Sequence, residues 1–118
     1  MALTTFEKKF GADFLASVTK QPGVYRFYSK SGVVLYVGKA KDLRTRLAQY
    51  RSAKRIKAHR KMKRIVKASA RIEVELSANE KEALLLENQL IQTLRPKFNV
   101  TGVFSFMYPS LGLKRTEG

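Results

Sequence analysis

The sequence predicts an α+β fold in which a small antiparallel sheet of about three strands is flanked by α-helices. Two β-branched and aromatic runs, 24–28 and 33–37, flank the turn sequence 29–32 and predict a hairpin. A third run, 71–76, alternates apolar and charged side chains, as a half-buried strand does. Segments with helical periodicity surround these runs. With 118 residues, the chain is expected to fold as one main domain.

The first helix is predicted over residues 4–18, within an N-terminal helical extension of residues 1–20. Thr4 is followed three positions later by Glu7, which is the pattern of a capping box. Three aromatic residues then recur at helical spacing and form one apolar face: Phe6, Phe10 and Phe14. This face is expected to serve packing.

The hairpin is expected to bring two tyrosines together. A turn centred between Lys30 and Ser31 would place Tyr25 directly opposite Tyr36, on one face of the sheet. A slip of one residue would separate them. Such a pair is by itself more often an ordinary cross-strand aromatic contact than a pair of catalytic phenols.

A helix is predicted to follow the hairpin, with Asp42 as its N-cap and an end near Tyr50. Arg46 and Tyr50 are four residues apart and therefore share one face of this helix.

The next segment, 51–71, is strongly basic. Its apolar residues fall at helical spacing, so it is interpreted as a basic amphipathic helix that binds phosphates. The segment contains no acidic residue, and its cations are Arg51, Lys54, Arg55, Lys57, Arg60, Lys61, Lys63, Arg64, Lys67 and Arg71.

Two overlapping capping boxes, Ser77 with Glu80 and Asn79 with Glu82, predict the start of a last helix, which Pro96 stops. Residues 101–118 form an apolar tail, expected to be either an added strand or the beginning of a truncated segment.

Glu87 is the residue that is hardest to explain by packing. Its neighbours one helical turn away are apolar: Ala83, Leu84, Leu90 and Ile91. An unpaired buried carboxylate costs several kcal/mol, so Glu87 requires a cation. Its spacing leaves two alternatives open, an ion pair with Lys39 or Arg46, or a bound metal ion.

The amino-acid composition limits the classes of partner and metal ion that this protein can bind. A formal net charge of +15 implies a polyanionic partner, DNA or RNA first. The chain has no cysteine and one histidine, His59, so any metal ion should be a hard one held by oxygen. No apolar stretch is long enough to span a bilayer and the N-terminus lacks a signal pattern, so we expect a soluble cytoplasmic protein without a membrane partner.

Several ordered motifs within residues 21–100 resemble the GIY-YIG nuclease family, most closely its UvrC-like branch. The matching strings are Pro22 to Tyr25, Leu35 to Leu47, Glu82 to Glu87, Leu90-Ile91 and Arg95 to Val100. The resemblance implies a GIY-YIG fold and hydrolysis of a phosphodiester by in-line attack of water. The products would carry a 5′-phosphate and a 3′-hydroxyl.

The resemblance also assigns residue roles. Tyr25 would be the general base or its relay, and nearby cations, Lys39 or the metal, would have to lower its pKa. Glu87 would bind one Mg²⁺ or Mn²⁺, and Arg46 would grip a phosphate oxygen. The full catalytic set that it implies is Tyr25, Tyr36, Lys39, Arg46, Tyr50, Glu87 and Asn99.

The expected substrate is DNA in a duplex, damaged or branched form, with a repair or targeting protein as a further partner. A non-catalytic nucleic-acid-binding module and a nuclease subunit activated by a partner are the alternatives. The candidate DNA-binding cations are Lys41, Arg44, Arg51, Lys54, Arg55, Arg60, Lys61 and Arg64.

Overall fold

The computed structural model describes residues 3–54 and 56–100. Its centre is an antiparallel sheet of β1 (Gly23–Tyr28), β2 (Val34–Ala40) and β3 (Arg71–Leu76), in the spatial order β2-β1-β3. The predicted α+β class and three-stranded sheet are therefore confirmed. Because β1 is central, β2 and β3 are the edges of this sheet.

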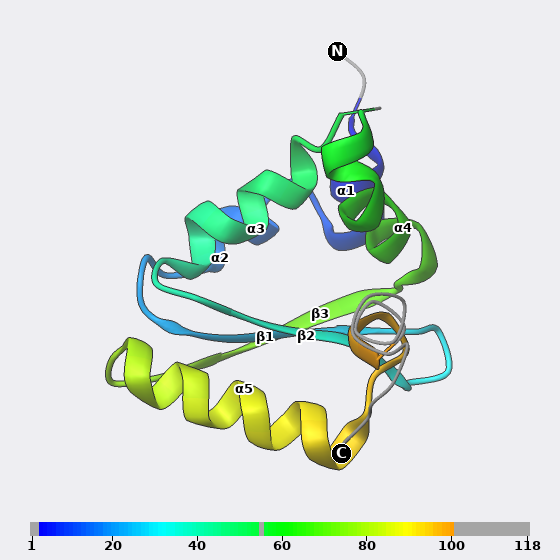
Figure 1. Cartoon of the computed structure of the whole chain (residues 1–118). Coiled ribbons are helices and arrows are strands. Elements are labelled where there is room, and N and C mark those ends of the chain that lie inside the picture. The colour runs from blue at the N-terminus through cyan, green and yellow to red at the C-terminus, as the bar shows by residue number, and fades with distance from the viewer. Residues whose placement is uncertain (1–2, 55, 101–118) are drawn as a thin grey trace.

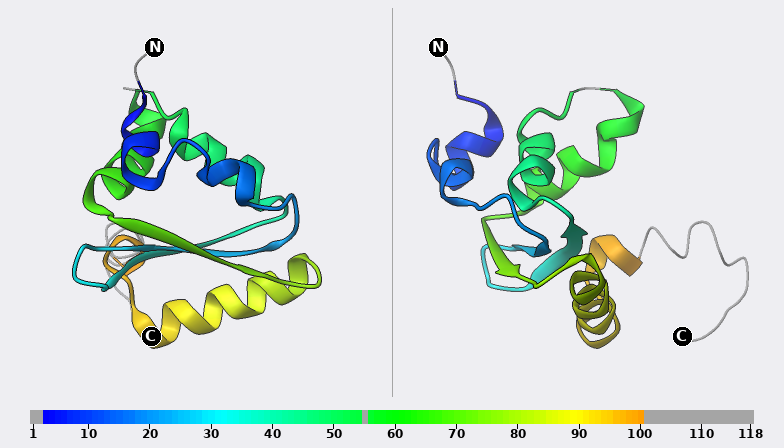
Figure 2. Two further views of the ribbon diagram at one scale, coloured as in Figure 1. Left: turned by 180° about the vertical axis from the view of Figure 1, so that it is seen from behind. Right: turned by 90° about the vertical axis from the view of Figure 1, so that its left-hand side faces the viewer.

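Helices cover both faces of the sheet (Figure 1). The long helix α5 (Glu80–Leu94) lies across one face, and four helices lie over the other, with the short 3₁₀ turn η1 (Lys57–His59) before the last of them. These four are α1 (Thr5–Phe10), α2 (Phe14–Ser17), α3 (Leu43–Arg51) and α4 (Arg60–Ala68). Figure 2 shows the same layers from behind and from the side.

The two faces have separate apolar cores, because side chains alternate along each strand. Tyr25 and Phe27 of β1 point into the larger core, which also contains Phe6, Leu47 and Ile65 from the helices above. The smaller core, below the sheet, joins Val24 and Val37 to Ala83 of α5.

The expectation of one helix over residues 4–18 is wrong. The capping box is present, since the Thr4 hydroxyl accepts from the Glu7 amide at 3.1 Å and the Glu7 carboxylate accepts from the Thr4 amide at 3.0 Å. The helix nevertheless ends after Phe10, because Gly11 adopts a φ of 100°, which no continuing helix permits. A second short helix, α2, follows, and the three predicted phenylalanines still cluster.

The hairpin register also differs from the expected one. Tyr25 pairs with Gly38, and Phe27 pairs with Tyr36. The register shifts between Phe27 and Tyr28, beside a turn in which the Ser29 amide donates to the Val33 carbonyl. The resulting displacement is two residues, so Tyr25 and Tyr36 stay on one face, as diagonal neighbours.

Helix α3 has the predicted cap, with Asp42 Oδ1 accepting from the Thr45 amide at 3.0 Å. The basic segment is less helical than expected. Only Arg60–Ala68 is α-helix, after the turn η1, and Ile65 and Val66 are its buried residues. Among the described residues between α3 and η1, which are 52–54 and 56, no apolar side chain is buried against the core.

Asn79 is the N-cap of helix α5, and its side chain accepts from the Glu82 amide at 2.9 Å. Of the two predicted capping positions, Asn79 therefore sets the start, through this one side-chain hydrogen bond. It ends at Arg95, in the left-handed conformation with φ 46°, immediately before Pro96. The expectations for residues 101–118 lie outside the described residues. Within the described part of the chain, no helix is long and apolar enough to cross a membrane.

Candidate active site

Three tyrosines from different elements meet above the sheet. The hydroxyls of Tyr25 in β1 and Tyr50 in α3 are 2.9 Å apart and form a buried hydrogen bond. The Tyr36 ring, on β2, lies 6.2 Å from the Tyr25 ring between centroids. Tyr25 and Tyr50 are 3% and 5% exposed, whereas Tyr36 is half-buried and packs against the edge of the larger core. We call these three side chains the phenol cluster.

Gly38 makes room for this cluster. It is the direct cross-strand partner of Tyr25, and a Cβ atom at position 38 would overlap the Tyr25 ring. The glycine of the second motif is therefore needed for close packing of the phenol. Sequence reasoning missed this role, although the spacing of the motif contained the signal.

Burial raises the pKa of all three phenols, most strongly for Tyr25 and Tyr50. The Tyr50 hydrogen bond and the charge of Arg46 lower the pKa of Tyr25 and offset only part of the rise. The expectation that the cations of the chain bring the pKa of Tyr25 toward neutrality is therefore wrong for the chain's own side chains. The cation acting on Tyr25 is Arg46, one turn from Tyr50 on α3, and not Lys39.

Glu87 approaches the site from the opposite layer. It lies on α5 beside Ala83, Leu90 and Ile91 of the lower core and is half-buried. Burial raises its pKa, while the charge and the backbone amide of Lys39 lower it. Its negative charge also raises the pKa of Tyr25 and Tyr36, so it acts on the phenol cluster around the β2 edge. Lys39 is thus the predicted cationic neighbour.

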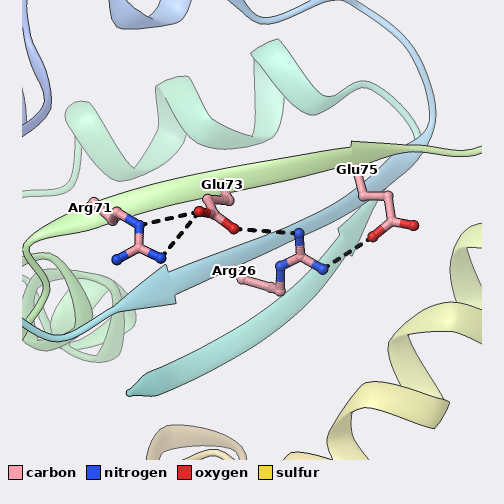
Figure 3. Close-up of polar contacts among 4 residues, drawn as sticks. All are labelled: Arg26, Arg71, Glu73 and Glu75. Atoms are coloured by element: carbon pink, nitrogen blue, oxygen red, sulfur yellow. Dashed lines mark hydrogen bonds and ion pairs between the residues drawn. The ribbon is translucent and has the colours of Figure 1, made fainter. Parts of the chain in front are cut away.

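The carboxylates of β3 have their own cations (Figure 3). Arg26 of β1 lies 3.1 Å from Glu75 and 3.7 Å from Glu73, and Arg71 lies 3.1 Å from Glu73. Within residues 3–54 and 56–100, no group of three or more acidic or histidine side chains could hold a metal ion. A metal at the phenol cluster would therefore depend on Glu87, with water and phosphate oxygens as its other ligands, an arrangement that suits a hard cation such as Mg²⁺.

Asn99 is used structurally. Its Oδ1 accepts from the Val37 amide at 2.9 Å and its Nδ2 donates to the Val37 carbonyl at 3.0 Å. The side chain thus pairs with the edge strand β2 as another strand would, and holds the strand that carries Tyr36 and Lys39.

The predicted DNA-binding cations do not form one surface. The Lys61 ammonium lies over the Tyr36 ring, 5.2 Å from its centroid, and so belongs to the rim of the site. Arg44 instead donates to the carbonyls of Val18 at 2.7 Å and Ala16 at 3.2 Å and anchors α2.

Of the other predicted cations, Lys41 and Lys54 are exposed, and Arg55 lies outside the described residues. Arg51, Arg60 and Arg64 line a cavity near α1. Three more cations of this cavity belong to the predicted phosphate-binding segment 51–71 but not to the shorter set of candidate DNA-binding cations: Lys57, Lys63 and Lys67.

Comparison with known proteins identifies the family of this chain. Residues 21–100 match the model of the UvrC-like GIY-YIG domain. UvrABC system protein C of Yersinia pseudotuberculosis is 46% identical over 105 residues, covering 89% of this chain and 17% of that protein. The Proteus mirabilis protein is 52% identical over 87 residues, covering 74% of this chain and 14% of that protein. The chain thus spans less than a fifth of the length of these relatives.

A solved structure gives the same result. The GIY-YIG N-terminal endonuclease domain of UvrC from Thermotoga maritima, bound to magnesium as its catalytic cation, is 37% identical, with a TM-score of 0.65. The alignment covers 80% of this chain and 94% of that domain. The fold and these matches identify a nuclease domain. The chain belongs to the UvrC-like GIY-YIG family.

Proposed function

We propose that this nuclease domain is a divalent-metal-dependent DNA endonuclease of DNA repair, which hydrolyses a phosphodiester bond to a 5′-phosphate and a 3′-hydroxyl. The observation that carries the proposal is the cluster of three phenols, with the Tyr25 and Tyr50 hydroxyls 2.9 Å apart and the Tyr36 ring 6.2 Å from that of Tyr25. The charges of Arg46 and Glu87 both act on the pKa of Tyr25. Phenols, a guanidinium and a carboxylate in one neighbourhood are groups suited to phosphodiester hydrolysis.

Glu87 would hold one Mg²⁺ or Mn²⁺. Structures of the Thermotoga maritima domain contain the divalent cation even when a tyrosine is changed to phenylalanine or an asparagine to alanine. In that domain the cation is thus retained when these side chains are changed, which is compatible with a carboxylate as the protein ligand. When bound, the cation supplies Lewis-acid stabilisation of the charge that builds on the leaving 3′-oxygen.

Tyr25 is the group we propose to accept the proton of the attacking water. Its hydroxyl is hydrogen-bonded to Tyr50, which can stabilise a Tyr25 phenolate by donating to it. Because burial raises the pKa of both, this pair is protonated at neutral pH in the chain alone. Tyr25 therefore accepts the proton as a phenolate generated next to additional positive charge, or relays it by giving up its own proton to a further base in the bound complex.

Arg46 and Lys39 would bind the phosphate. Both side chains are exposed at the site, where they can meet a substrate. The guanidinium of Arg46 stays charged and can contact two phosphate oxygens, which stabilises the additional negative charge of the transition state. Arg46 is held on α3, and its Nη1 donates to Gln49 Oε1 at 3.1 Å.

Nicking of supercoiled plasmid by the purified chain tests this function. We expect nicks in Mg²⁺, none in excess EDTA, and a loss of nicking in Glu87→Ala with retained DNA binding. The nicked strand should accept radioactive phosphate from a kinase only after phosphatase treatment, because its 5′ end already carries phosphate. DNA binding without any nicking in Mg²⁺ or Mn²⁺ would refute the proposal for the isolated chain.

The relatives named above are components of the UvrABC system. We therefore propose that a repair protein directs this domain to its DNA. The prediction is that such a partner increases nicking of damaged over undamaged plasmid. Equal stimulation on both would contradict a targeting role.

A further inference from the structure

A basic cavity lies away from the phenol cluster, between α1, the end of α3, and α4. These helices sit together above the sheet (Figure 1). The cavity has a volume of about 800 Å³, within the usual size range of ligand pockets. Its charged lining consists of Arg51, Lys57, Arg60, Lys63, Arg64 and Lys67, and we call it the basic cavity.

Within residues 3–54 and 56–100, no acidic side chain pairs with a cation of the basic cavity. No acidic residue is among its lining residues. The ion pairs formed between described residues belong to Arg26 and Arg71 of the sheet, and none involves a cavity cation. The charge of Arg51 lowers the pKa of Glu7, but the Glu7 carboxylate already caps α1. Six like charges around one hollow repel one another, and an anion relieves that repulsion.

The remaining lining favours phosphate groups over bases. Its aromatic residues, Phe6 and Tyr50, are buried and offer no face on which a base could stack. A lining of lysine and arginine side chains, with no carboxylate or amide side chain beside them, can bind backbone phosphates. Such contacts distinguish little between DNA sequences. The volume exceeds that of a single phosphate, so the cavity can take successive phosphates of one strand.

The basic cavity is connected to the catalytic site. Tyr50 forms part of its wall and is hydrogen-bonded to Tyr25. Helix α4 contributes to both places, since Lys61 lies over Tyr36 while Arg60 and Arg64 line the cavity. A nine-residue helix is about 13 Å long, which corresponds to about four phosphate steps at ~3.4 Å per strand.

We propose that the basic cavity binds DNA backbone phosphates within about four nucleotides of the phosphate that is cleaved. Lys61 then contacts the strand at the rim of the site, and the cavity holds it further along. This inference rests on the proposed DNA endonuclease function, which supplies the ligand.

The first test compares two triple variants that each remove three positive charges, both in the Glu87→Gln background. The cavity variant is Arg60→Ala, Lys63→Ala, Arg64→Ala, and alanine favours helix, so α4 should persist. The control changes three exposed lysines outside the cavity: Lys20→Ala, Lys30→Ala and Lys81→Ala. Circular dichroism melts of both variants verify folding.

Binding of a duplex is measured by fluorescence anisotropy against salt concentration. If the parent neutralises about five phosphates, log K should fall with log salt at a slope of about −4 to −5. We expect the cavity variant to weaken binding at least tenfold and to flatten the slope by up to about 3, with a change below about threefold in the control. Equal losses in the two variants would show that net charge alone determines binding and would overturn the proposal.

The second test locates the contact on the DNA. A neutral methylphosphonate placed two to four nucleotides from the cleaved phosphate should weaken binding by the parent and leave the cavity variant unaffected. An equal effect on both proteins would overturn the proposal. Since the first test measures binding by a cleavage-deficient protein, a failure of cleavage by the parent would refute the nuclease function without affecting the test of the cavity.

Discussion

At the scale of single residues, the site depends on a buried pair of hydroxyls beside a half-buried carboxylate. Tyr25 and Tyr50 satisfy one another's hydrogen bonding, which a buried phenol requires. Glu87 has a raised pKa because burial outweighs the attraction of Lys39. These groups have a destabilising electrostatic environment, as is typical of functional sites.

Tyr25→Phe should separate proton transfer from binding. The change keeps the ring against Gly38 and removes only the hydroxyl, so we expect DNA affinity within about twofold of the parent. The single-turnover rate should fall by about 10²-fold or more, the usual contribution of a general base. The cleavage rate of the parent should rise with pH on the basic side, as Tyr25 loses its proton. This rise should disappear in Tyr25→Phe, because phenylalanine has no group that titrates. If Tyr25→Phe cleaves at the parent rate with an unchanged pH profile, Tyr25 takes no part in proton transfer and serves only packing.

Glu87→Gln should raise the melting temperature at pH 7 without divalent metal. Burial raises the pKa of Glu87 in the fold, so its ionisation opposes folding, and the variant gains stability at pH values above that raised pKa. The gain should vanish below about pH 4.5, the ordinary pKa, where the carboxyl is protonated in both states. Calorimetry measures it, with the exposed Glu82→Gln on the same helix as the control. A lower melting temperature for Glu87→Gln at pH 7 would show that the attraction of Glu87 to the charge and the backbone amide of Lys39 outweighs the cost of its burial.

At the scale of elements, the site is positioned by the pairing of β1 with β2 and by the hydrogen bonds that Asn99 makes to the outer edge of β2. Gly38 lets the Tyr25 ring lie across the pair, and Asn99 occupies the hydrogen-bonding groups of Val37 at the edge. An edge strand without such a partner leaves its backbone groups to solvent or to another chain.

Gly38→Ala should destabilise the protein by about 1–3 kcal/mol, the usual cost of overpacking, and should lower the cleavage rate by displacing Tyr25. Urea unfolding measures the stability. In a double-mutant cycle with Tyr25→Ala, most of the loss caused by alanine at position 38 should disappear once the ring is absent. Additive effects in the cycle would contradict the proposed contact.

Asn99→Ala should cost about 1–3 kcal/mol, because it removes two hydrogen bonds to Val37 and each contributes about 0.5–1.5 kcal/mol. The exposed Asn88→Ala on α5 is a matched control, for which we expect less than about 0.5 kcal/mol. Urea unfolding of both variants decides the matter. If Asn99→Ala lowers the free energy of unfolding no more than Asn88→Ala does, the proposed structural role of Asn99 is contradicted.

The elements differ in how far the sequence predicted them. Strands with clear alternation, such as Arg71–Leu76, and helices with side-chain caps, such as those at Asp42 and Asn79, were predicted correctly because their signals are local. The hairpin register was predicted two residues off, since an irregularity beside the turn has no local signature. The N-terminal helix was predicted too long, because its aromatic spacing continues past Gly11 while the backbone does not.

At the scale of the whole molecule, the sheet separates the chemistry into two layers (Figures 1 and 2). The phenols, Arg46 and the basic cavity belong to the helices and strands above, while Glu87 belongs to α5 below. Residue types suggested the members of this site, but only the tertiary structure shows that the Glu87 charge, from the other side of the sheet, acts on the pKa of Tyr25 and Tyr36. The net charge of the sequence predicted a polyanionic partner. That Lys61 lies over Tyr36 while other cations of the same segment line the basic cavity is seen only in the fold.

The most direct test of the account is single-turnover cleavage of a duplex oligonucleotide in Mg²⁺ by the parent, Glu87→Gln and the control Glu82→Gln. Glutamine preserves the shape of the side chain and removes the negative charge that would hold the cation. We predict cleavage by the parent and by Glu82→Gln at similar rates, and less than about 1% of that rate for Glu87→Gln, with unchanged DNA affinity, a loss within the range for removing a metal-dependent step. Cleavage by Glu87→Gln at more than a few per cent of the parent rate would contradict the assignment of Glu87 as the carboxylate that holds the metal.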